Sequence, residues 1–266
     1  MRAVILAAGY GTRLEQDLRS DTSGQYTHLI GIPKPLLPIG QSPLITHWVR
    51  DFEQTPEITS VIIVVNDFHK KRYENWAETL QRKVVIVSDG SMNNDERTGA
   101  VACMMVGVQQ CKEDTIFVAG DTLFQKDFSL NSVILKFQAL CKQEKEACLI
   151  LSAPVLEENV SKHGIIEVAE SGRVTRFLEK PLPVVTSSRL QCPCFYIISS
   201  ESLHYLQIFL EQTKDKPLSS RDATGTFIAE LINQVPVYAH HTEGRYDVGS
   251  LQSYEQCHHD FMEVDQ

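Results

Sequence analysis

The chain opens with RAVILAAGYGTRL over residues 2–14, where an apolar and partly β-branched run breaks into a glycine turn. The pattern predicts a buried strand over 2–8. Glycine lacks Cβ and tolerates φ > 0, so a turn that contains Gly9 and Gly11 lets backbone N–H groups approach an anion closely. Arg13 then stands at the rim, where its planar guanidinium group can hold phosphate oxygens bidentately. The stretch therefore favours a polyphosphate site at the carboxyl end of a first strand.

Other interpretations of this stretch meet specific obstacles. A dinucleotide-binding fingerprint requires a third glycine three residues after Gly11, where Leu14 stands, and an acidic residue after a second strand. A P-loop requires Gly-Lys-Ser or Gly-Lys-Thr, and the sequence contains neither. A tight turn with an exposed arginine stays open as the simplest alternative, although it leaves the rest of the pattern unexplained.

The composition is that of a globular protein, with 42% hydrophobic and 22% charged residues in a chain of 266. Its formal charge of −9 disfavours nonspecific binding to nucleic acid or to an anionic membrane, since both need a positive field. No apolar run approaches the roughly 18 residues of a membrane span. The seven scattered cysteines fit reduced thiols better than a disulfide framework. We therefore expect a cytoplasmic protein, and whether it forms a homo-oligomer stays open.

Strands and helices alternate through the first part of the chain. Apolar runs predict strands over 60–65, 84–87 and 115–119, and helices fall between the successive strands, at 43–54, 69–80 and 99–108. This alternation predicts an open, mostly parallel sheet with helices on both faces. We expect Ser42 to cap the helix over 43–54. Residues 16–32 are polar without a sustained period, and they indicate a mobile loop.

The second half of the chain has a different pattern. Two strands separated by Glu170-Ser171-Gly172 predict a hairpin over 163–168 and 173–178. Further strands and helices are expected at 147–152, 194–198 and 235–240, and at 131–142, 201–212, 227–233 and from Ser250 onward. No linker rich in Gly, Ser or Pro separates two independent units. The economical prediction is one domain with an elaborated second half.

Two acidic residues stand where open parallel sheets place their ligands. Asp121 follows the strand over 115–119, and Asp247 comes after a short strand and before Val248-Gly249. Mg²⁺ takes oxygen ligands, commonly one or two carboxylates together with substrate phosphates. Both residues are therefore candidate metal ligands, and a cap on the following turn is the alternative for each.

A charged pair follows the second strand of the predicted hairpin. Pro181 excludes further pairing on an interior edge, so Glu179 and Lys180 are expected at a rim. A solvated surface is the simple alternative. Gly164 on the partner strand favours a site, because a ligand can pass close to backbone there.

Five motifs occur in the order typical of one family. They are LAAGYGTRL (6–14), PKPLLPIG (33–40), GD (120–121), FLEKP (177–181) and YDVG (246–249). Together they resemble the sugar-phosphate nucleotidyltransferases, which include glucose-1-phosphate thymidylyltransferases and relatives that use UTP or GTP. The resemblance spans essentially the whole chain. It implies a three-layer Rossmann-like α/β fold of the nucleotide-diphospho-sugar transferase type.

The resemblance also implies how the chain is divided. Residues 1–266 would form one catalytic domain, with a nucleotide-binding half over 1–125 and a sugar-phosphate-binding half over 126–266. The left-handed β-helix that many relatives append is not expected here.

The same resemblance implies roles residue by residue. Arg13, Lys34 and Lys180 match the catalytic cations, and Asp121 and Asp247 match the ligands of Mg²⁺. The implied nucleotide-binding residues are Ala8, Gly9, Gly11, Thr12, Arg13 and Gly99. The implied substrate-binding residues are Gly164, Glu179, Lys180 and Tyr196. His163 stands where the family more often has an aromatic residue.

The implied reaction is Mg²⁺-dependent transfer of a nucleotidyl group from an NTP to a sugar-1-phosphate, with release of pyrophosphate. The resemblance favours dTTP or UTP as donor and glucose-1-phosphate as acceptor. A largely dianionic sugar-1-phosphate can attack the α-phosphorus without a general base, so positioning and charge neutralisation are what catalysis requires. One alternative is a cytidylyltransferase that acts on phosphocholine or a polyol phosphate. Another is a noncatalytic regulator that binds nucleotide sugars, which would predict loss of the charged positions that this chain retains.

Overall fold

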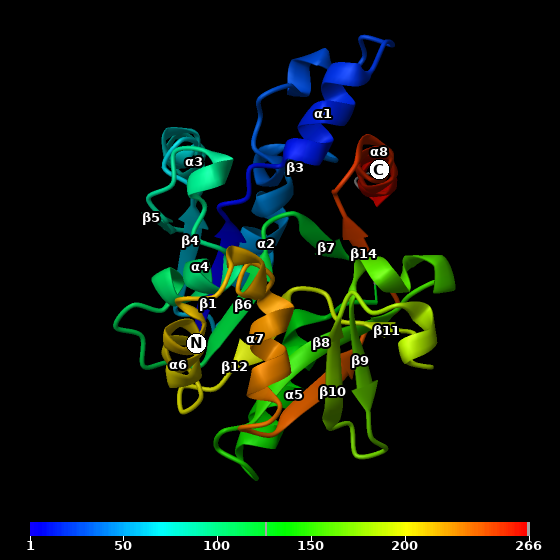
Figure 1. The fold of residues 1–266 in the computed structure, drawn as a ribbon. Helices are drawn as coiled ribbons and strands as arrows, with labels where there is room; N and C mark the ends of the chain where they lie inside the picture. Colours follow the sequence, from blue (N-terminus) through cyan, green and yellow to red (C-terminus); the bar gives the residue numbers. More distant parts are fainter. Residues whose placement is uncertain (126, 265–266) are drawn as a thin grey trace.

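A ten-stranded sheet with helices on both faces forms the centre of the molecule (Figure 1). The computed structural model describes residues 1–125 and 127–264. Residue 126, the first residue of the predicted sugar-phosphate-binding half, and residues 265–266 lie outside this description. The strands are β1 (Arg2–Ala7), β4 (Ser60–Val65), β5 (Val85–Ser88), β6 (Thr115–Ala119), β8 (Cys148–Pro154), β9 (Gly164–Val168), β10 (Val174–Glu179), β11 (Leu190–Gln191), β12 (Phe195–Ile198) and β13 (Val237–His241). The predicted open α/β sheet is confirmed.

The strand order is β10-β9-β11-β8-β12-β6-β1-β4-β5, with β13 paired to β8. In the first half, β1 lies parallel to both β4 and β6, and β4 lies parallel to β5. In the second half, β12 runs antiparallel to β6 and β8, and β9 and β10 form the predicted antiparallel hairpin. The sheet is therefore mixed. The strand pairs within the first half are parallel, and in the second half β13 also lies parallel to β8, beside the antiparallel pairs.

Two separate apolar cores show why the fold has three layers. Alternate side chains of a strand point to opposite faces. Ala3 and Ile5 of β1 join one core, whereas Val4 joins the other. The first core is covered by α2 (Leu44–Glu53), α3 (Lys70–Ala77), α5 (Leu130–Cys141) and α8 (Leu251–Val264). The second is covered by α4 (Ala100–Gly107), α6 (His204–Thr213) and α7 (Thr224–Leu231).

The loop predicted over 16–32 is wrong in part. Helix α1 spans Thr12–Ser20, and a 3₁₀ turn, η1, spans Thr27–Leu29. Leu14 and Leu18 are one helical turn apart and both are buried in the first core. α1 packs beside α8, and the Leu251 amide donates to Asp17 Oδ2 at 3.1 Å (Figure 1). A nine-residue helix gains most of its stability from such packing, which explains why the local pattern does not reveal it.

The capping role predicted for Ser42 is also wrong. Pro43 is the N-cap of α2, without a side-chain hydrogen bond, because Ser42 belongs to the short strand β3 (Ser42–Pro43). β3 pairs with β2 (Pro38–Ile39), and this pairing fixes the backbone that enters the helix.

A second small sheet, not predicted, pairs β7 (Thr122–Phe124) with β14 (Arg245–Asp247). The remaining 3₁₀ turns are η2 (Lys34–Leu36), η3 (Asn94–Glu96), η4 (Glu157–Lys162), η5 (Pro183–Val185) and η6 (Leu218–Ser220). Among the described residues, no helix is both long and apolar enough to cross a membrane.

Candidate active site

The carboxyl ends of β1 and β6 open into a cavity of about 420 Å³. Leu6 and Ala8 line it from the end of β1, and Ala119 and Asp121 line it from the end of β6. Register explains why these ends meet, since Leu6 pairs with Ala119 in parallel strands. Open α/β sheets bind their ligands at this edge.

The glycine turn after β1 forms one wall of this cavity. Ala8, Gly9 and Arg13 line it. Gly11 has φ +63°, a left-handed conformation that favours glycine, and a Cβ placed there would lie 3.1 Å from Lys34 Cγ. Gly11 lines a smaller adjoining cavity of about 100 Å³. Thr12, the first residue of α1, belongs to the lining of neither cavity.

Lys34 and Asp121 meet at the junction of these two cavities. Lys34 lies in the turn η2, and its Nζ donates to Asp121 Oδ2 at 3.3 Å. Both side chains line both cavities. The predicted catalytic cation and the predicted metal ligand are therefore neighbours.

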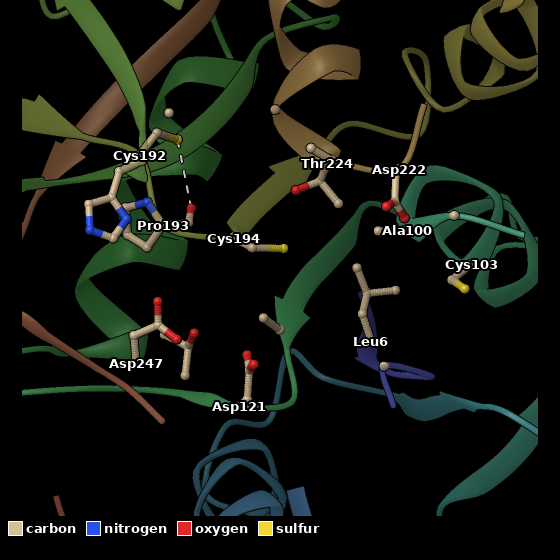
Figure 2. Close-up of a pocket in the computed structure, with 18 of the residues that line it drawn as sticks. Leu6, Ala100, Cys103, Asp121, Cys192, Pro193, Cys194, Asp222, Thr224 and Asp247 are labelled. Atoms are coloured by element: carbon tan, nitrogen blue, oxygen red, sulfur yellow. Dashed lines mark hydrogen bonds between the residues drawn. The ribbon is translucent and has the colours of Figure 1, made fainter. Parts of the chain in front are cut away.

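The small β7–β14 sheet places Asp247 beside Asp121. Asp247 pairs with Thr122, and the Val248 amide donates to the Asp121 carbonyl oxygen at 3.1 Å. Figure 2 shows both carboxylates on the same side of the cavity. Asp247 Oδ2 forms an ion pair with Arg245 Nη2 at 3.2 Å.

The two carboxylates have the chemistry of a Mg²⁺ site. In the described part of the chain, no group of three or more His, Cys, Asp or Glu side chains is arranged to hold a metal. Mg²⁺ is commonly held by one or two carboxylates, with substrate phosphates and water completing its coordination. Asp121 and Asp247 fit that pattern rather than an all-protein cage.

The lining of the cavity also includes predicted sugar-binding residues. Gly164 of β9 and Glu179 of β10 line it, and their backbones pair in the hairpin. A Cβ on Gly225 would collide with Glu179 Oε2, so glycine in the first turn of α7 leaves room for this carboxylate. Burial raises the pKa of Glu179 above its ordinary value. Tyr196 also lines the cavity, and its hydroxyl group lies 2.9 Å from Thr224 Oγ1.

Lys180 is placed differently from the other predicted residues. It is absent from the lining of the cavity, and its side chain is 59% exposed. Its φ of +49° is unusual for a residue other than glycine. Its amide donates to the His163 carbonyl oxygen at 3.1 Å, which fixes its backbone beside the cavity. Lys162 lines the cavity from the end of η4.

Gly99, a predicted nucleotide-binding residue, lines the cavity next to residues that the sequence did not single out. Arg97 pairs with Asp222 at 3.1 Å, and the Ala100 amide donates to the Asp222 carbonyl oxygen at 3.0 Å. The segment before α4 is thereby tied to the segment before α7. Asp89, directly after β5, also lines the cavity, and its Oδ1 accepts from the amide and hydroxyl groups of Ser91.

Three cysteines line the cavity, namely Cys103, Cys192 and Cys194 (Figure 2). All seven cysteines have free thiols in the structure. Burial raises the pKa of Cys194 to about 11 and that of Cys103 to about 12, so both are protonated near neutral pH. Sequence reasoning did not place them in the cavity.

Sequence reasoning missed several cations that line the cavity, and Arg245 is the most buried of them. A signal for it exists, because residues two positions apart on a strand share a face and Arg245 precedes Asp247 by two. Its side chain is 11% exposed and lines the cavity.

The sheet edge places two carboxylates and several cations around one cavity, an arrangement typical of α/β proteins that bind phosphate-bearing ligands. The chain belongs to the nucleotidyl transferase family, whose model matches residues 2–263. The family expected from the five sequence motifs is thus confirmed.

Similarity to individual proteins supports this family assignment. The chain is 26% identical to a UTP–glucose-1-phosphate uridylyltransferase of Synechocystis, over 97% of this chain and 62% of that protein. It is also 26% identical to a mannose-1-phosphate guanyltransferase beta-B of Xenopus laevis, over 78% of this chain and 52% of that protein. The chain therefore spans only part of the length of these relatives.

A solved structure shares the fold. The apo form of a UDP-glucose pyrophosphorylase aligns with a TM-score of 0.77 and 20% identity, over 100% of this chain and 99% of that one. The Rossmann-like fold of the nucleotide-diphospho-sugar transferase type is thereby confirmed.

Proposed function

We propose that this chain transfers a nucleotidyl group from an NTP to a sugar-1-phosphate and releases pyrophosphate. UTP or dTTP is the favoured donor, and glucose-1-phosphate is the favoured acceptor. The observation that carries the proposal is the meeting of Lys34 with Asp121 at the sheet edge, in one cavity with Asp247 and Glu179. The uridylyltransferase among the relatives supports the choice of substrates.

We assign the nucleotide phosphates to the glycine turn, where Arg13 and Lys34 supply positive charge. Ala8, Gly9, Gly11, Thr12 and Gly99 complete the proposed nucleotide site. On this assignment residues 1–125 form the nucleotide-binding half of one catalytic domain, and residues 126–266 form the sugar-phosphate-binding half. The sugar phosphate would lie against Gly164, Glu179 and Tyr196, with Lys180 reaching its phosphate from the rim.

Asp121 and Asp247 are the proposed ligands of Mg²⁺. A bound Mg²⁺ would neutralise phosphate charge and orient the reacting phosphates. The residues of the chain then need only hold the attacking phosphate oxygen in line with the α-phosphorus and shield its charge. No side chain has to remove a proton, because a sugar-1-phosphate is largely dianionic at neutral pH. The seven free thiols support a cytoplasmic setting.

The test is a matrix of the common NTPs against sugar-1-phosphates, with pyrophosphate release as the signal. We expect turnover with at least one pair, strongest for UTP or dTTP with glucose-1-phosphate, and dependent on added Mg²⁺. Folded protein that releases no pyrophosphate in any combination would contradict the proposed function.

A further inference from the structure

Arg245 is held by acceptors from three parts of the chain. Its Nε donates to Gln191 Oε1 at 3.1 Å, and its Nη2 lies 3.1 Å from His163 Nδ1 and 3.2 Å from Asp247 Oδ2. Gln191 is itself fixed, since its amide nitrogen donates to the Pro154 carbonyl oxygen at 2.9 Å. A guanidinium group on a side chain only 11% exposed, with three such contacts, has little freedom to reorient.

The contact with Arg245 determines the tautomer of His163. A guanidinium group carries only donors, so Nδ1 of His163 must accept the hydrogen bond. A neutral imidazole that accepts at Nδ1 carries its proton at Nε2. Burial and the neighbouring Arg245 also lower the pKa of His163, which agrees with a neutral ring.

The Nε2–H group of His163 is available to a ligand. Within residues 1–125 and 127–264, no hydrogen bond joins Nε2 to another group, and Nε2 is not among the buried side-chain atoms that lack a partner. Solvent therefore reaches this atom. His163 lines the cavity directly before Gly164. Glu179 lines the same cavity, and a Cβ on Gly164 would lie 3.4 Å from its Oε2 atom.

We propose that His163 is a neutral hydrogen-bond donor to an oxygen of the sugar-1-phosphate, and that Arg245 is the positioning residue that fixes its tautomer. This inference rests on the proposed function. A hydroxyl group both donates and accepts hydrogen bonds, so hydroxyl groups of a sugar in this cavity can donate to Glu179 and accept from His163. A site of this kind discriminates against an analogue that lacks the hydroxyl group.

The first experiment reads the tautomer directly. Long-range ¹H–¹⁵N NMR spectra of the full chain distinguish the protonated from the unprotonated ring nitrogen, and a spectrum of His163→Phe identifies the signals of this residue. We expect an unprotonated Nδ1 and a protonated Nε2 at pH 7.5, with the Nε2–H signal shifting on addition of glucose-1-phosphate. The opposite tautomer, or a doubly protonated ring, would overturn the inference.

The second experiment compares His163→Phe with His163→Gln. Phenylalanine keeps a ring without a donor, whereas a glutamine amide can place a donor near the former Nε2 position. We expect His163→Phe to weaken the affinity for the sugar-1-phosphate about tenfold to a hundredfold, with kcat little changed, and His163→Gln to restore much of the loss. Calorimetry with glucose-1-phosphate, its deoxy analogues and inorganic phosphate separates a hydroxyl contact from a phosphate contact.

The third experiment tests whether Arg245 acts by positioning His163. In a double-mutant cycle on sugar-phosphate affinity, Arg245→Met should add little to His163→Phe, and Arg245→Lys should retain part of the wild-type affinity. Additive effects of the two substitutions on affinity would contradict the positioning role of Arg245.

A protein that shows no turnover would count against the proposed function alone, because binding and the shift of the Nε2–H signal are measured without turnover. Equal binding of every probe to wild type and His163→Phe, or no binding to wild type, would overturn the inference.

Discussion

Lys34 Nζ lies 3.3 Å from Asp121 Oδ2, although 87 positions separate the two residues in the sequence. The pair joins the turn η2 to the end of the central strand β6. A cation bound by Asp121 would compete with this ammonium group and leave it free for a phosphate oxygen. The second carboxylate has a similar partner, since Asp247 pairs with Arg245. Each proposed metal ligand is therefore held in the cavity by a cation.

We predict that Asp121→Asn lowers turnover by about a hundredfold or more, because a bound metal contributes several kcal/mol to stabilising charge on the reacting phosphates. The measurement is the rate of pyrophosphate release over a range of Mg²⁺ concentrations. Asp215→Asn is the matched control, since Asp215 is exposed and outside the cavity. Equal activity of the two variants would remove Asp121 from the metal site.

Gly11→Ala should damage both stability and activity. A non-glycine residue in the left-handed conformation costs about 1–2 kcal/mol, and the added Cβ would press on Lys34. Gly24 has φ +73°, and a Cβ placed there would meet no atom within 4 Å, so Gly24→Ala carries similar backbone strain without that contact. Urea denaturation should give similar losses for the two variants, and only Gly11→Ala should lower kcat/KM. If Gly24→Ala lowers kcat/KM equally, contact with Lys34 is not the cause.

Gly225→Ala should raise the KM for the sugar-1-phosphate, because the new methyl group would displace the Glu179 carboxylate and the Phe177 ring. We expect an increase of about tenfold, comparable to the loss of one buried hydrogen bond. The same substitution in a Glu179→Ala background should change KM much less. Steady-state kinetics on the four proteins of this cycle provide the measurement, and a fully additive result would argue against displacement of Glu179.

We predict that the free energy of unfolding falls at alkaline pH because Cys148 has a buried thiol. Burial raises the pKa of Cys148 to about 11 from its ordinary value of 9.0. Above pH 9 the unfolded chain releases this proton and the folded chain keeps it, so the stabilising contribution is complete below pH 9 and is lost as the pH rises through 11. Two pKa units correspond to about 2–3 kcal/mol.

Cys148→Ala tests this effect because Cys148 is fully buried and lies outside the cavity. Urea denaturation between pH 8 and 11 should show the gap in stability between wild type and variant narrowing as the pH rises. A gap independent of pH would mean that this thiol does not titrate differently in the folded and unfolded states.

The sequence by itself determined the parts of this protein that depend on neighbouring residues. The glycine turn after β1, the alternating strands of the first half and the strand-end positions of Asp121 and Glu179 follow from apolar periodicity and turn chemistry. Those signals extend over a few residues, so they indicate where a strand ends but not which strand lies next to it. Such local signals did not predict the short helix α1, because α1 is stabilised by packing against α8.

The tertiary structure alone decided which distant side chains meet. Strand order brings Asp247 beside Asp121 through the β7–β14 pair, and it brings Arg245 within 3.1 Å of His163 across 82 positions. Contacts of this kind depend on sheet topology and on space left by particular residues, such as Gly225 beside Glu179. Local periodicity carries no information about either, so the charged groups could be predicted one by one, whereas their pairing into a site required the fold.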